Sequence, residues 1–91
     1  MPQNYVRHPQ LAGRVVDGLA FIVTAEDNKL ITLNAAATLL WQELKEPQNS
    51  DHLAAALSAR YEVSLENAKA DVQECLDDLV ARQILTTHDE G

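Results

Sequence analysis

The sequence is poor in the residues that build catalytic and metal sites. It holds one cysteine, Cys75, and therefore neither a disulfide framework nor a cysteine cluster for zinc or iron–sulfur. Its three glycines, Gly13, Gly18 and Gly91, are too scattered to form a phosphate-binding loop. The three histidines have no metal-ligand spacing. We therefore expect no metal site, no cofactor and no enzymatic activity.

Basic residues and long apolar runs are also scarce. Seven Lys and Arg stand against 14 Asp and Glu, and the resulting net charge of −7 opposes binding to nucleic acid. No apolar run approaches the roughly 18–20 residues that a membrane span needs. The first ten residues, M-P-Q-N-Y-V-R-H-P-Q, lack the apolar core of a signal peptide. We expect a soluble, cytoplasmic protein.

The chain of 91 residues has the size of one domain with a small, aliphatic core. We treat residues 1–91 as that domain and expect 1–10 and 88–91 to be loose. A β-hairpin is predicted over 11–24, because Asp17-Gly18 suits a type I′ turn, in which both central residues have positive φ. On its second strand we expect one face to be buried, the face of Leu19, Phe21 and Val23.

The segment 29–44, K-L-I-T-L-N-A-A-A-T-L-L-W-Q-E-L, organises the rest of the chain. After a polar loop at 25–28, residues 29–33 alternate and are rich in Ile, Thr and Leu, which predicts a third strand with Ile31 and Leu33 inward. Asn34 is a suitable N-cap for a helix over 35–46. Because strand and helix meet without a loop, we expect the core to centre near Leu33 and Trp41.

Two further helices and a short strand are predicted after this corner. Ser50 and Ser64 are the expected N-caps. The second helix should turn Leu53, Leu57 and Tyr61 inward, and the third should bury Ala68, Val72, Leu76 and Leu79. Residues 84–87 can add a final strand. The fold class is thus α+β and winged helix-turn-helix-like, a three-stranded antiparallel β-meander followed by three helices.

The order of these motifs resembles the PqqD-like family, whose members are also called RiPP recognition elements. The strongest stretch, L-N-x-x-A-x-x-x-W-x-x-L, is met by Leu33, Asn34, Ala37, Trp41 and Leu44. Weaker matches are Asp17-Gly18, Leu57 with Tyr61, Asp71-Val72, Leu76, Leu79 and Ile84-Leu85. The chain departs from the family at Ala36, where threonine is frequent, and at Gln83, where glycine is usual, so the end of the third helix can differ.

The resemblance implies a non-catalytic adaptor that binds the leader segment of a ribosomally made precursor peptide and presents it to a modifying enzyme. In the family that enzyme is often a radical SAM protein, and the leader adds as a strand beside the third strand and the third helix. It leaves open which peptide and pathway are served, including whether pyrroloquinoline quinone is the product. The strand that the leader would join supplies the predicted peptide-binding residues Lys29, Leu30, Ile31, Thr32 and Leu33. We add Asp71, Cys75 and Asp78, which fall on adjoining parts of the third helix and could rim the groove.

Several alternatives stay open at this point. The acids of the third helix are either a solvated face or the rim of a groove that favours basic leaders. Cys75 fits a small core residue better than a nucleophile, because no motif supplies it with a base. The unprotected edge of the third strand also permits a homodimer. A winged-helix DNA-binding regulator is the rival function, which the acidic third helix opposes.

Overall fold

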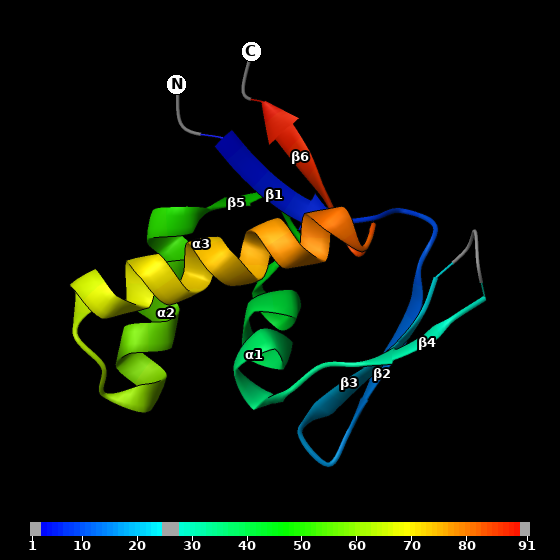
Figure 1. Cartoon of the computed structure of the whole chain (residues 1–91), viewed down its shortest axis with the longest axis horizontal. Helices are drawn as coiled ribbons and strands as arrows, with labels where there is room; N and C mark the ends of the chain where they lie inside the picture. The colour runs from blue at the N-terminus through cyan, green and yellow to red at the C-terminus, as the bar shows by residue number, and fades with distance from the viewer. Residues whose placement is uncertain (1–2, 25–27, 90–91) are drawn as a thin grey trace.

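The structure is a computed structural model that describes residues 3–24 and 28–89. It confirms an α+β chain with a three-stranded meander followed by three helices, and it adds a second small sheet (Figure 1). The elements in chain order are β1 (Gln3–Arg7), β2 (Ala12–Val16), β3 (Leu19–Val23), β4 (Leu30–Thr32), α1 (Ala35–Glu43), β5 (Gln48–Asn49), α2 (Ser50–Tyr61), α3 (Leu65–Ala81) and β6 (Leu85–Asp89).

The predicted hairpin and meander are present. Asp17 and Gly18 have φ values of 53° and 80°, as a type I′ turn requires. The antiparallel sheet has the order β2-β3-β4, and β4 is shorter than the predicted strand at 29–33. Most of the polar loop that we expected before β4, residues 25–27, lies outside the described residues.

The prediction for the buried face of the hairpin was wrong. Ala20 and Ile22 of β3 are fully buried, whereas the alternate residues Leu19, Phe21 and Val23 lie on the outer face. The cause is Trp41, which packs against the inner face: a Cβ added at Gly13 would lie 2.8 Å from its ring atom Cζ2. At position 13, only glycine leaves room for that ring.

The N-terminal segment is not loose as expected, because β1 forms the centre of a second antiparallel sheet with the order β5-β1-β6. Tyr5 pairs with Thr87 and is buried. The Arg7 guanidinium lies 3.5 Å from the centre of the Trp41 ring, and its Nε donates to the Trp41 carbonyl oxygen at 2.8 Å. These contacts fix β1 on α1. Pairing with β1 extends β6 to Asp89, beyond the predicted strand at 84–87, so residues 88 and 89 are not loose as expected.

The helices begin close to where the sequence predicts. Asn34 caps α1 by accepting from the Ala37 N–H at 2.8 Å, and Ser64 caps α3 by accepting from the Asn67 N–H at 3.2 Å. The N-cap of α2 is Asn49 and not Ser50, since its side chain accepts from the His52 N–H. A favourable cap one residue earlier decides the start.

The apolar stripes are confirmed with one exception. Leu33 and Trp41 are buried at the corner of β4 and α1, as expected. Tyr61, predicted to point inward, is 41% exposed at the end of α2, while Leu53 and Leu57 are buried. The four stripe residues of α3 are also buried, namely Ala68, Val72, Leu76 and Leu79. Helix α1 ends at Glu43, short of the predicted 46.

Gln83 stands after α3 at the position where glycine is usual, and the helix still ends with the hydrogen bonds that such a glycine would form. Gln83 takes the left-handed conformation with φ of 63°, and its N–H donates to the Val80 carbonyl. The Ile84 N–H donates to the Leu79 carbonyl at 2.9 Å, which completes a Schellman-type end. The chain then turns directly into β6.

In the arrangement of Figure 1, α3 crosses the molecule between the two sheets, and the meander projects to one side of the helices. In residues 3–24 and 28–89, no helix combines the length and apolar character that crossing a membrane would require.

Candidate functional site

The outer edge of β4 is open within the part of the chain that the structure describes, because β4 pairs with β3 alone. The Leu33 N–H donates to the Ala20 carbonyl at 2.9 Å, and the Thr24 N–H donates to the Lys29 carbonyl at 3.1 Å. In an antiparallel ladder, the alternate residues direct their backbone groups to the other side. The N–H and C=O groups of Leu30 and Thr32 therefore face the open edge.

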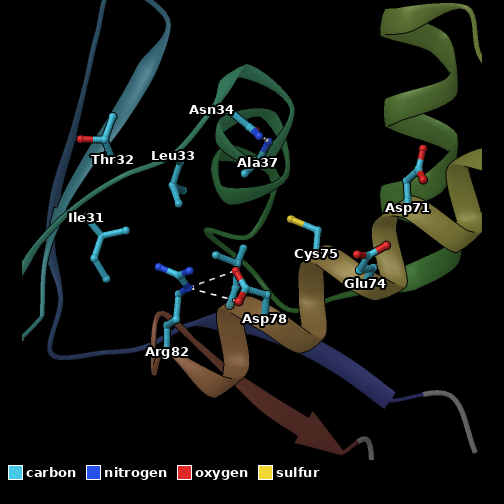
Figure 2. Close-up of a pocket in the computed structure, with 11 residues that line it drawn as sticks. Ile31, Thr32, Leu33, Asn34, Ala37, Asp71, Glu74, Cys75, Asp78 and Arg82 are labelled. Carbon is cyan, nitrogen blue, oxygen red and sulfur yellow. Dashed lines mark hydrogen bonds and ion pairs between the residues drawn. The ribbon is translucent and has the colours of Figure 1, made fainter.

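A groove of about 600 Å³ lies beside this edge, between β4, the start of α1 and one face of α3 (Figure 2). Leu33, Ala37 and Leu79 form its buried apolar floor. Figure 2 shows the Ile31 side chain on the groove side of β4 and that of Thr32 pointing away from α3. The remaining lining residues are Asn34, Asp71, Glu74, Cys75, Asp78 and Arg82.

The wall that α3 contributes is acidic. Asp71, Glu74 and Asp78 are exposed along it, and three carboxylates against the one guanidinium of Arg82 leave a net charge of −2. Arg82 Nε lies 3.1 Å from both carboxylate oxygens of Asp78. Since both side chains are more than half exposed, this ion pair is weak and can be exchanged for another partner.

Cys75 lies half-buried in the middle of this wall, with its sulfur directed into the groove (Figure 2). Burial raises the pKa of its thiol, and the charges of Asp78 and Glu74 raise it further. The thiol is therefore protonated and weakly polar at neutral pH, the opposite of an activated nucleophile. It acts as an apolar surface between the acids. Among the described residues, no three His, Cys, Asp or Glu side chains are grouped to hold a metal ion.

The groove brings together six of the eight residues that were predicted to bind the peptide: Ile31, Thr32, Leu33, Asp71, Cys75 and Asp78. The other two, Lys29 and Leu30, line a neighbouring depression of about 520 Å³ that reaches the end of α3. Arg82 and Ile31 contribute to both spaces.

The predicted set omits Glu74 and Arg82. Helical spacing could have found both, because Glu74 stands three residues after Asp71, and Arg82 stands four after Asp78. The omitted Asn34 and Ala37 belong to the cap and first turn of α1, where the strand-to-helix corner exposes them to the groove.

Comparison with solved structures identifies a close fold match. The chain is similar to the structure described as "TbiB1 in Complex with the TbiA(beta) Leader Peptide", with a TM-score of 0.83 over 93% of this chain and 99% of that one. The sequences are 16% identical, so the likeness is one of fold. No curated protein matches the chain.

The family comparison covers most of the fold that has been described. The model of "Coenzyme PQQ synthesis protein D (PqqD)" matches residues 20–85, from β3 to the start of β6. This range includes the edge of β4 and every residue that lines the groove. The chain therefore belongs to the PqqD family.

Proposed function

We propose that this protein is a non-catalytic adaptor that binds the leader segment of a ribosomally synthesised precursor peptide and presents it to a modifying enzyme. The observation that carries the proposal is the open edge of β4 beside the groove along α3. Membership of the PqqD family supports it, as does the likeness of fold to a protein whose structure holds a leader peptide.

In this mechanism the leader adds as a strand to β4. The outward backbone groups of Leu30 and Thr32 bind the main chain of the leader, which gives affinity that tolerates many sequences. At roughly 3.3 Å per residue, the three residues of β4 span about 10 Å and pair with a short stretch of leader. Alternate leader side chains then point into the groove.

The groove would select among leaders by shape and charge. Its floor accepts an apolar side chain over Leu33 and Leu79. A lysine or arginine of the leader could pair with Asp71 or Glu74, neither of which forms an ion pair with another described residue. We therefore include these two acids with Lys29, Leu30, Ile31, Thr32, Leu33, Cys75 and Asp78 in the proposed peptide-binding set.

The same charges count against the rival function. In a winged-helix regulator, a recognition helix approaches DNA phosphates. Here α3 carries Glu66, Asp71, Glu74, Asp77 and Asp78 against the single cation Lys69. Each phosphate contact would have to overcome this repulsion.

The direct test is a titration with the fluorescently labelled leader of the precursor peptide encoded nearest the gene, followed by fluorescence anisotropy. We expect saturable binding that a scrambled leader does not reproduce. We also expect the leader to slow alkylation of Cys75, because the thiol lies in the groove. Absence of saturable binding would contradict the proposed function.

The charge preference has a separate test with the same assay. Replacing Asp71 with Asn and Glu74 with Gln in one variant should weaken binding of a lysine- or arginine-containing leader about threefold to tenfold, and added salt should reduce the difference. The matched control is Asp51→Asn in the first turn of α2, outside the groove. If the double variant bound as wild type at low salt, the acids would be a solvated face only.

A further inference from the structure

The outer face of the meander is apolar and uncovered by any described element. Because the inner face of β3 is buried against Trp41, the alternate residues of each strand point outward. Leu30 is 66% exposed, Val16 42% and Val23 37%. The helices lie on the other side of the sheet (Figure 1). Val23 and Leu30 lie opposite each other on β3 and β4, and contiguous exposed apolar residues of this kind mark interaction sites.

This face is also hollowed. A depression of about 300 Å³ spans all three strands of the sheet. The residues that line it are Ala12, Gly13, Arg14, Phe21, Val23 and Leu30. Arg14 is the one charged residue in this set, and it forms no ion pair with any residue that the structure describes. The hollow therefore fits an apolar side chain accompanied by a carboxylate that can reach Arg14.

Charge makes a second copy of this chain a poor occupant. A two-fold pairing of this face would place two Arg14 side chains, with no carboxylate from the hollow, in one apolar interface, where unpaired charge is costly. Each copy would also carry its net charge of −7 to the contact. A different protein that offers an acid within an apolar patch matches the face better.

The position of the outer face indicates which partner protein would bind it. Leu30 belongs both to the hollow and, through its backbone, to the open edge of β4. A leader strand added to that edge would lie directly beside the hollow, at the inter-strand distance of about 4.8 Å. A protein bound on the outer face would thus touch the precursor as well as the adaptor.

From these observations, we infer that the outer face of β2-β3-β4 docks the peptide-modifying enzyme, through an apolar surface that places a carboxylate opposite Arg14. The inference rests on the proposed function and adds a second binding surface to it. The leader occupies the α3 side of β4, and the enzyme occupies the opposite side of the same sheet. The two sites can therefore be separated by substitution.

The test uses two variants on the outer face, Arg14→Glu and Phe21→Ser, with Arg60→Glu on α2 as the charge-matched control. The probes are the purified modifying enzyme and the labelled leader of the precursor, both encoded nearest the gene. Enzyme affinity is measured by biolayer interferometry on immobilised adaptor, and leader affinity by anisotropy. Circular dichroism verifies that each variant is folded.

We expect both variants on the outer face to weaken enzyme binding at least tenfold, with leader affinity within twofold of wild type and the control unchanged in both assays. The inference would be overturned if both variants bound the enzyme as tightly as wild type does, or if the wild type bound the leader but not the enzyme. Either result would leave strand addition intact. A change confined to self-association in analytical ultracentrifugation would overturn it in favour of a homodimer. Absence of leader binding by the wild type would instead refute the proposed function.

Discussion

Replacement of Thr32 by proline tests strand addition at the backbone group on which it depends. The N–H of Thr32 faces the open edge of β4 and not β3, so its loss removes no hydrogen bond of the folded protein. Proline is tolerated in edge strands where the missing N–H faces solvent. The preceding residue, Ile31, already has the extended conformation that proline demands.

The expected effect on leader binding follows from two terms. Loss of one main-chain hydrogen bond costs about 1 kcal/mol, and the carbonyl of the leader that the proline ring leaves unpaired costs about 1 kcal/mol more. Together, about 2 kcal/mol corresponds to a roughly 30-fold increase in Kd. Thr32→Val is the matched control: it retains the N–H and the branched shape, and we expect its Kd within twofold of wild type.

The assay is leader anisotropy on both variants, with folding verified by circular dichroism and by urea denaturation. Ile31→Pro would be a poor substitute, because the Ile31 N–H belongs to the ladder with Ile22 and its loss would destabilise the sheet. A folded Thr32→Pro variant with a Kd within twofold of wild type would refute binding by strand addition at β4.

Three further predictions concern the core, the end of α3 and the thiol. Gly13→Ala should lower the free energy of unfolding by about 1–3 kcal/mol in urea denaturation, because its Cβ would lie 2.8 Å from Trp41 Cζ2; an unchanged value would contradict that contact. Gln83→Gly should raise the free energy of unfolding by about 0.5–1 kcal/mol, because glycine adopts the φ of 63° without strain. A lower free energy of unfolding in the same urea assay would contradict this. The rate of Cys75 alkylation by iodoacetamide, followed against pH, should have a midpoint above that of a free cysteine peptide. Asp78→Asn should lower this midpoint, because it removes one of the charges that raise the thiol pKa. A wild-type midpoint at or below that of the peptide would be inconsistent with a raised thiol pKa.

Local signals in the sequence predicted much of the fold and the groove. The turn at Asp17-Gly18, the cap at Asn34 and the apolar stripe of α3 each depend on residues within a few positions of one another. The inward direction of Ile31 and Leu33 follows from strand alternation. Since the groove lies between β4 and α3, correct placement of these two elements was sufficient to name six of its lining residues.

The second sheet could not be predicted in this way, because its stability comes from partners distant in sequence. β1 is a five-residue segment of mixed character, and it becomes a strand by pairing with β6 at the other end of the chain. Tyr5 is buried by the same assembly. Short strands of this kind have little intrinsic preference, so tertiary contacts decide their structure.

The reversed face of the hairpin shows that steric fit can outweigh hydrophobicity. Leu19, Phe21 and Val23 form the more apolar face of β3, yet the sheet turns the face with Ala20 and Ile22 inward. The Trp41 ring lies directly against Gly13, where a Cβ would come within 2.8 Å of it, so the face that carries Gly13 must turn inward.

That same steric choice connects the core to both proposed binding surfaces. Because β4 pairs in register with β3, the burial of Ile22 also sets Ile31 toward the groove and Leu30 toward the outer face. A one-residue slip would exchange the two sides and would place Leu30 toward α3. The packing of Trp41 on Gly13 helps to hold this face of β3 inward, and it thereby contributes to which residues of β4 would meet the leader and which would meet the enzyme. It follows that substitutions at Gly13 should alter leader and enzyme binding together, whereas substitutions at Arg14 should alter enzyme binding alone.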